Sequence, residues 1–183
     1  MKYLIQTLVL FVLLSSCKKE QDPFLMSKQH IGFLTDSTQV KDLESVFIND
    51  SVSKYIGGDE FTGNINDIEI YEKGGNLLMV LTPSEALDST SVIKSVRVID
   101  ERFKTSKGIT FKSTFKDIRD AYEISSIQNS LSNLIVSFNA INVYVNIDKK
   151  ELPEELRHNP DIKIDAIQIP DNAKIKNFYI QWY

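Results

Sequence analysis

The sequence predicts an α+β fold of two tandem units, each a short helix followed by an antiparallel β-meander, with the two meanders able to join into one continuous sheet. The first observation behind this prediction is an internal repeat. Residues 113–122 resemble residues 37–47 once Gln39 is skipped, at an offset of 76 residues before the skip and 75 after it. That period is too long for a solenoid repeat and matches a small α/β unit. The second observation is the abundance of Val, Ile, Phe and Tyr in alternating runs, which favours strands.

Both copies of the repeat predict the start of a helix. In the second copy, Thr114 is placed to cap the helix and Asp117 falls at its third position, near the positive end of the helix dipole. The apolar residues that follow recur at helical spacing in both copies, namely Phe115, Ile118, Ala121 and Tyr122 in one and Val40, Leu43, Val46 and Phe47 in the other. The Lys-Asp pair within each copy is expected to lie exposed on the outer face of its helix.

The units are expected to span residues 29–102 and 103–183. Period-2 alternation and turn residues predict the strands, which are 67–71, 76–81 and 92–100 in unit one and 133–138, 141–148, 162–169 and 175–182 in unit two. Residues 73–76 contain two glycines and are expected to form a hairpin turn. The segment 149–159 is expected to form a short helical turn, with Pro153 near its start.

Residues 1–17 have the layout of a signal peptide. Lys2 is followed by an apolar run over 4–14, which is too short to span a membrane permanently. The residues Leu14, Ser15 and Ser16 then precede Cys17, the only cysteine in the chain. This order resembles the bacterial lipobox, and the resemblance implies cleavage before Cys17 and attachment of lipid to it. The alternative is an ordinary signal peptide that happens to contain a cysteine.

The residues after Cys17 bear on the location of the protein. The run from Ser16 to Glu20 resembles the start of lipoproteins from the Bacteroidetes group. This resemblance implies a lipid-anchored protein of the outer membrane, facing either the periplasm or the cell surface. Residues 18–28 are polar, contain Pro23 and are expected to form a tether.

The lead-in to each predicted helix carries a second resemblance. Gly108-Ile109 followed by Thr114, Asp117 and Ile118, and Gly32-Phe33 followed by Thr38, Asp42 and Leu43, resemble the beta-lactamase-inhibitor-protein-like and BamE-like (SmpA/OmlA) domains. Tandem copies of such domains can form one concave sheet, and members of the group bind enzymes or outer-membrane assembly partners. The resemblance therefore implies a non-catalytic module that binds a protein in the cell envelope.

Composition excludes several other functions. The formal net charge is −4, or −5 once Lys2 is removed with the signal peptide, and no basic patch with interleaved aromatics is present, which argues against nucleic acid as a partner. His30 and His158 are the only histidines, and neither has a partner at metal-ligand spacing. The chain also lacks a Gly-x-Ser-x-Gly turn and a phosphate-binding glycine loop. We therefore expect no enzyme activity, no metal and no cofactor.

Two kinds of binding function remain. The first is a sheet face presented to a protein partner, with the chain acting as an outer-membrane accessory factor or as an inhibitor or immunity protein. The alternative is a small-ligand or glycan site that uses the aromatics Tyr144, Tyr179, Trp182 and Tyr183, although Trp182 could instead face the core. A flat apolar patch would favour a protein, whereas a cleft lined by aromatic and polar groups would favour a ligand.

Three short sequences match the O-glycosylation pattern of Bacteroidetes envelope proteins, in which Asp precedes Ser or Thr. They make Ser37, Ser51 and Ser89 candidate attachment sites.

Overall fold

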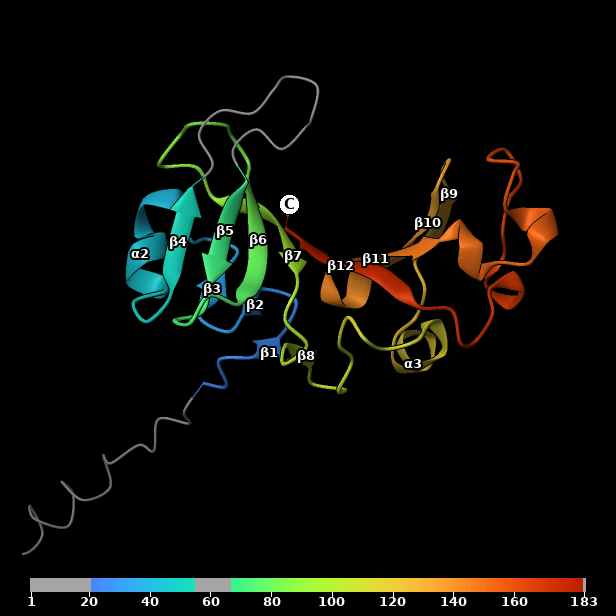
Figure 1. Ribbon diagram of the computed structural model, residues 1–183, viewed down its shortest axis with the longest axis horizontal. Helices are drawn as coiled ribbons and strands as arrows, with labels where there is room; N and C mark the ends of the chain where they lie inside the picture. The colour runs from blue at the N-terminus through green and yellow to red at the C-terminus, as the bar shows by residue number, and fades with distance from the viewer. Residues whose placement is uncertain (1–20, 55–66, 183) are drawn as a thin grey trace, which may run out of the picture.

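Strands dominate the protein, as Figure 1 shows for the computed structural model. The structure describes residues 21–54 and 67–182, without the side chain of Lys54. The expected signal peptide over residues 1–17, which includes Cys17, and Tyr183 lie outside these residues. Within them, no helix is both long and apolar enough to cross a membrane.

One antiparallel sheet of eight strands runs through the molecule in the order β4-β5-β6-β7-β12-β11-β10-β9. Its strands are β4 (Ser51–Lys54), β5 (Ile68–Tyr71), β6 (Leu77–Pro83), β7 (Ile93–Val98), β9 (Ser126–Asn129), β10 (Asn133–Phe138), β11 (Val143–Asp148) and β12 (Ile175–Gln181). The last strand, β12, lies in the middle of the sheet and pairs with β7 on one side and β11 on the other. Figure 1 shows this arrangement, with β12 in red beside β7.

A second, smaller sheet has the order β3-β2-β1-β8, formed by β1 (Leu25–Met26), β2 (His30–Ile31), β3 (Leu34–Thr35) and β8 (Lys104–Thr105). The pairing of β1 with β8 is parallel. Gly32 lies in the turn after β2 with φ of +54°, and a Cβ atom there would come within 2.3 Å of the Pro23 carbonyl oxygen. Residues 25–26 form β1 and so belong to the folded part, although the sequence analysis placed them in the tether.

The helices are short. They are α2 (Leu43–Val46), α3 (Phe115–Ala121) and five 3₁₀ turns, η1 (Val40–Asp42), η2 (Asn139–Ile141), η3 (Lys149–Glu151), η4 (Glu154–Leu156) and η5 (Ala166–Gln168). Of the described helices, only α3 exceeds a single α-helical turn. Its start follows the expected chemistry, because the Thr114 hydroxyl accepts a hydrogen bond from the Asp117 backbone N–H and the Asp117 carboxylate accepts one from the Thr114 N–H.

The predicted fold class is therefore wrong. The protein is mostly sheet, with one eight-stranded antiparallel sheet and one four-stranded sheet in place of two helix-plus-meander units. The small sheet was not expected, and neither were β4 and β9. Their strands have two to four residues each, which is too short for alternation to be recognised in the sequence.

The first expected helix, over about 39–48, is reduced to η1 and one turn of α2. No side chain caps either element, because the Thr38 hydroxyl accepts instead from the Thr35 backbone N–H. Gln39, the residue skipped in the repeat, forms an antiparallel bridge with Val92 and is held in extended conformation. Without a cap, a segment this short has little helical preference of its own.

Most of the predicted strands of the large sheet are present within two residues of their expected ends, and β10 matches 133–138. The expected strand over 162–169 is instead irregular and contains η5. The tight turn between β10 and β11 is η2, ended by Asn142 with φ of 54°. Asparagine adopts this left-handed conformation more readily than most residues.

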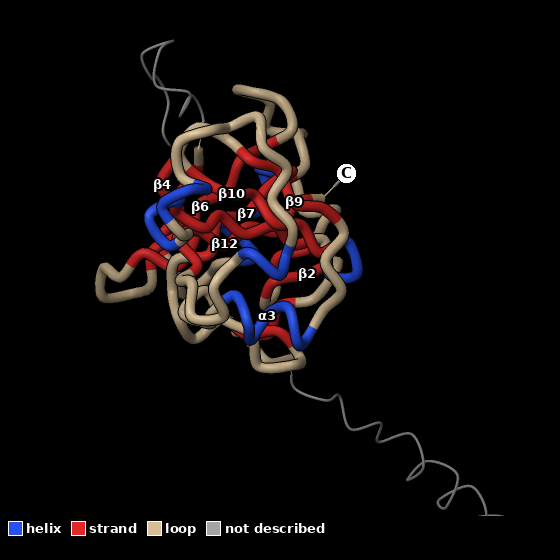
Figure 2. The backbone as a smooth tube through the Cα atoms, turned by 90° about the vertical axis from the view of Figure 1, so that its right-hand side faces the viewer, coloured by secondary structure: helices blue, strands red, loops and turns tan. Residues whose placement is uncertain are grey.

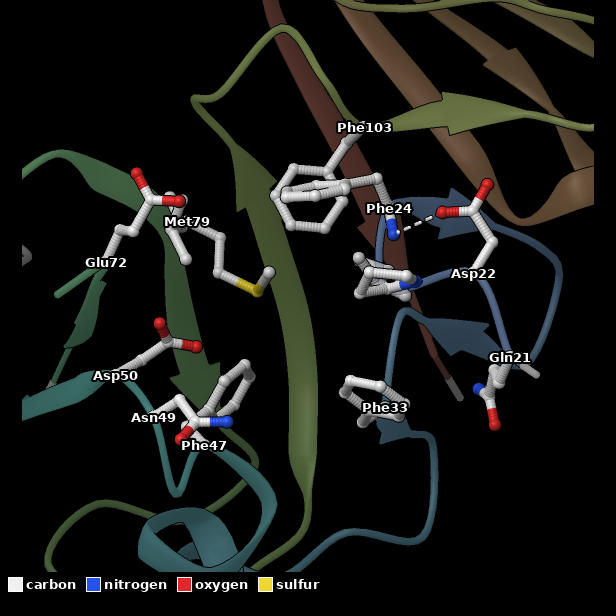
Figure 3. Close-up of a pocket in the computed structure, with 13 residues that line it drawn as sticks. Gln21, Asp22, Phe24, Phe33, Phe47, Asn49, Asp50, Glu72, Met79 and Phe103 are labelled. Carbon is white, nitrogen blue, oxygen red and sulfur yellow. Dashed lines mark hydrogen bonds between the residues drawn. The ribbon is translucent and has the colours of Figure 1, made fainter.

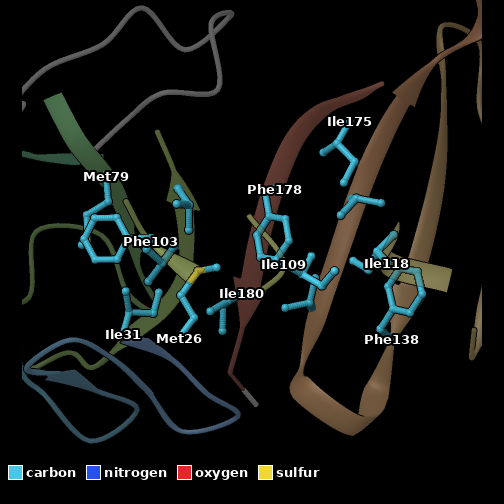
Figure 4. Close-up of a cluster of buried hydrophobic side chains, with 14 of the residues drawn as sticks. Met26, Ile31, Met79, Phe103, Ile109, Ile118, Phe138, Ile175, Phe178 and Ile180 are labelled. Atoms are coloured by element: carbon cyan, nitrogen blue, oxygen red, sulfur yellow. The ribbon is translucent and has the colours of Figure 1, made fainter. Parts of the chain in front are cut away.

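The core lies on one face of the large sheet, covered by the small sheet, α2, α3 and the loops between them. Figure 4 shows side chains from both sheets and from α3 in this layer, among them Met26, Ile118, Phe138 and Phe178. In Figure 2, α3 and β2 lie on the same side of the large sheet. Phe178 and Ile180 of β12 are fully buried, opposite Val98 and Val96 of β7. The covered face therefore provides the hydrophobic stabilisation, and the other face is left to carry different side chains.

The edges of the large sheet are short and polar. The edge strand β4 has the sequence Ser-Val-Ser-Lys, and the other edge strand, β9, has Ser-Ile-Gln-Asn. Each edge is therefore four residues long, with a single large apolar side chain.

We expect Thr114→Ala to lower the free energy of unfolding by about 1 kcal/mol, because the variant removes the hydroxyl that accepts from the first turn of α3. Urea denaturation followed by circular dichroism would measure the loss. Lys116→Ala is the matched control, since Lys116 is exposed on the same helix and its side chain pairs with Asp120. An equal loss in the control would contradict a specific capping role.

Candidate functional site

The uncovered face of the large sheet carries a row of side chains that runs across the strands. The cross-strand register places Ser137, Tyr144, Tyr179, Arg97 and Val80 side by side, from β10 through β11, β12 and β7 to β6. Val80 is buried, whereas the other four are half-buried. These residues alternate along each strand with the core residues, so the same pleat that buries Val145 and Phe178 turns Tyr144 and Tyr179 outward.

The two tyrosines stack on each other. Their ring centroids are 4.6 Å apart and the ring planes differ by 9°, so each ring has one face against its partner. The tyrosine pair joins two hollows, which we call together the tyrosine groove. The smaller hollow, about 290 Å³, lies beside Tyr144 where its neighbour Ser137 is small, and is also lined by Gln128, Ile135, Asn139, Asn142, Val143 and Gln181. The larger hollow, about 530 Å³, extends from the pair across β7 and β6 and is lined by Asp67, Val80, Thr82, Lys94, Ser95, Arg97, Tyr144, Tyr179 and Gln181.

Of the four aromatics suggested by the sequence, the structure brings together Tyr144 and Tyr179. Trp182 lies in the core layer with 4% of its surface exposed, and its indole N–H donates to the Lys28 carbonyl at 3.0 Å. Tyr183 lies outside the described residues. The three candidate glycosylation serines, Ser37, Ser51 and Ser89, are all exposed.

Some functional candidates were missed in the sequence. Arg97 and Gln181 line the tyrosine groove because their strands meet at β7–β12, and that pairing joins residues more than 80 positions apart. Only the alternation of polar residues in these strands pointed to an exposed face. In the part of the chain that the structure describes, His, Cys, Asp and Glu side chains do not gather in a group of three that could hold a metal.

A second concavity lies on the covered side, between the small sheet and the β4–β6 part of the large sheet. Figure 3 shows it, and we call it the apolar pocket. Its volume is about 780 Å³, and it is lined by Gln21, Asp22, Pro23, Phe24, Ile31, Phe33, Phe47, Asn49, Asp50, Glu72, Leu78, Met79 and Phe103. Its lining includes four phenylalanines and Met79, together with three carboxylate residues.

An ion-pair cluster borders the apolar pocket. The Arg102 guanidinium contacts Glu72 at 2.7 Å and Asp100 at 2.8 Å, and it lies 4.4 Å from the centre of the Phe24 ring. Hydrogen bonds from Arg102 lower the pKa of both carboxylates. Because Phe24 directly precedes β1 and Glu72 directly follows β5, the cluster ties the small sheet to the large one.

The fold is that of a mostly-β protein with a core on one face of its main sheet and a concavity on each side of that sheet. No protein-family model matches the chain, and no curated protein matches it. Among solved structures, it is similar to the crystal structure of the uncharacterized protein yfeY from Escherichia coli, with a TM-score of 0.52 and 16% sequence identity. The similarity covers 86% of this chain and 99% of that one. At this identity the similarity concerns the fold alone.

We expect Arg102→Gln to lower the melting temperature by a few degrees at pH 7, with the difference from the unchanged protein disappearing near pH 2. The carboxylates have lowered pKa values when folded, so their stabilising contribution is complete above the ordinary value of about 4 and is lost as the pH falls through the lowered values. Thermal denaturation across this pH range would test the expectation. Arg157→Gln is the control, because Arg157 donates to the Leu152 carbonyl and not to a carboxylate; a matching pH dependence there would contradict the assignment.

Proposed function

We propose that the protein is a lipid-anchored, non-catalytic binding module of the bacterial outer membrane, and that it binds a glycan in the tyrosine groove. The observation that carries the proposal is the groove lining. It combines an aromatic pair with hydroxyl, amide and charged groups, and it is not the flat apolar patch that a hydrophobic protein contact would favour.

The chemistry of the lining suits a polyol. Ser137, Asn142 and Gln181 provide donors and acceptors around the smaller hollow, and Tyr144 lies between Ser137 and Tyr179 in the register of the sheet. A sugar ring can stack on an aromatic face while its hydroxyls bond to neighbouring amides. The larger hollow adds Arg97 and Thr82, so the groove has room for several sugar units in a row.

The lipid anchor rests on Cys17 and the residues Leu14, Ser15 and Ser16 before it. We expect Cys17→Ala to abolish the attachment of lipid, because Cys17 is the only cysteine in the chain. The variant should then be either soluble or still joined to its signal peptide. Metabolic labelling with palmitate in a bacterial host would measure the attached lipid directly. Labelling that persists in the Cys17→Ala variant would contradict the anchor, and Ser16→Ala, which keeps a small residue before the cysteine, serves as the control.

The glycan proposal is tested on an array of bacterial surface oligosaccharides. We expect Tyr144→Ser combined with Tyr179→Ser to weaken binding at least about tenfold, since the variant removes the aromatic surface of both hollows. Tyr71→Ser is the matched control, because Tyr71 is a half-buried tyrosine of β5 whose hydroxyl donates to Glu69 and which lines neither hollow. Binding that survives the double substitution would exclude the tyrosine groove as the glycan site.

A protein partner on the same face is the second candidate, favoured by the presence of Tyr144, Tyr179 and Arg97, which are residue types enriched at protein interfaces. Chemical cross-linking in intact cells, followed by capture and mass spectrometry, distinguishes the two candidates. The protein partner would be favoured by two results together. One envelope protein would be captured in stoichiometric amount with the unchanged chain but not with the double tyrosine variant, and no glycan on the array would bind.

A further inference from the structure

The apolar pocket combines a hydrophobic floor with carboxylate residues in its lining. Its floor is hydrophobic, with Phe47 and Met79 buried at its base and Phe24 packed edge-to-face against Phe103 at a centroid distance of 5.2 Å. Carboxylates from three separate segments nevertheless face it, and Figure 3 shows Asp50 and Glu72 on the side opposite Phe24 and Phe33. The pocket is therefore apolar in surface and negative in charge.

The three carboxylates differ in how their charge is balanced. Glu72 is paired with Arg102, and Asp22 accepts a hydrogen bond from the Phe24 backbone N–H at 2.9 Å. Asp50 is half-buried, and the groups acting on it are the repelling Glu72, the attracting Arg102 and the backbone N–H of Lys73. Burial is the largest influence and repulsion by Glu72 the next, and together they raise the pKa of Asp50. The negative charge of Asp50 is thus only partly compensated.

The pocket also keeps an aromatic ring at its mouth. Phe33 lies in the turn between β2 and β3 and has 53% of its surface exposed. Half of this ring is therefore in contact with water, although other phenylalanines of the same pocket, such as Phe47 and Phe103, are buried. Burying the exposed part of the ring against an incoming apolar group would be favourable.

We propose that the apolar pocket binds an extended segment of a partner protein in which a lysine or arginine stands beside an apolar residue. The ammonium or guanidinium group lies against Asp50, and the apolar side chain lies between Phe33 and Met79. Charge complementarity selects a cation, because a neutral or anionic segment would leave Asp50 uncompensated or repelled. The volume of about 780 Å³ exceeds what one side chain fills, so the occupant is a segment rather than a single group.

This site is separate from the tyrosine groove, and it does not depend on what the groove binds. The two sites share no lining residue. The double tyrosine variant described above therefore serves as a control that keeps the apolar pocket intact.

The test uses the purified full chain in a nonionic detergent and three peptides. The first is acetyl-Leu-Lys-Phe-amide, the second carries acetyl-lysine in place of lysine, and the third carries glutamate there. Calorimetric titration is expected to show binding of the lysine peptide that is at least about tenfold tighter than that of the other two. Equal binding of all three peptides would overturn the proposal, because the carboxylates would then play no part.

Asp50→Asn keeps the size of the side chain and removes its charge. We expect this variant to bind the lysine peptide at least about tenfold more weakly while its melting temperature at pH 7 stays the same or rises. The sign follows from the raised pKa, because a carboxylate that binds its proton more tightly when folded destabilises the fold in its charged form. Phe33→Ser is expected to weaken the binding of the same peptide without unfolding the protein, since Phe33 is 53% exposed.

Two results would overturn the assignment even if a peptide binds. The first is unchanged affinity in Asp50→Asn and Phe33→Ser together with a loss in the double tyrosine variant, which would place the peptide in the tyrosine groove. The second is binding of butylammonium as tight as that of the lysine peptide, which would make the pocket a site for small amines and exclude a partner segment.

Discussion

The pairing of β7 with β12 is the interaction on which the rest of the structure depends. Without it, β4–β7 and β9–β12 would be two separate four-stranded sheets, each with a new unpaired edge in the middle of the molecule. The pairing aligns Val96 and Val98 with Ile180 and Phe178 on the covered face, so the hydrophobic core is continuous across the join. On the other face it places Arg97 beside Tyr179, and the tyrosine groove exists only because these strands are neighbours.

The N-terminal segment stabilises the pairing of β7 with β12 through contacts on both sides of it. The carbonyl of Lys28 accepts from the Trp182 indole and from the Asn142 side chain, and β1 pairs with β8 soon after β7 ends. Arg102 adds a charged contact between the same regions through Glu72 and Phe24. The small sheet thereby holds the central strands together. Its position leaves the apolar pocket open between the small sheet and β5–β6.

The sequence predicted the parts of the fold that depend on local chemistry. The cap of α3 and the alternation in β10, β11 and β12 were recognisable because each is decided by residues within a few positions of one another. The small sheet was not recognisable, because its strands have two residues each and because β1 also pairs with Lys104 and Thr105 of β8, far along the chain. The first helix failed for a similar reason, since the bridge between Gln39 and Val92 competes with the local helical pattern. Tyr144 and Tyr179 were proposed as binding aromatics from type alone, whereas the apolar pocket is lined by residues between 21 and 103 that come from several separate segments, and no local pattern marks that.

The short polar edges of the large sheet affect how neighbouring copies of the protein interact with one another. A protein tethered to a membrane by lipid, as we propose here, reaches a high local concentration in two dimensions. Long apolar edge strands would then pair between molecules and grow into extended sheets. The serine, glutamine and asparagine side chains of β4 and β9 limit such pairing, and each edge strand in the described part of the chain offers four residues for it. The protein can therefore be densely displayed on a surface while its copies remain separate, with the tyrosine groove and the apolar pocket still able to meet other molecules.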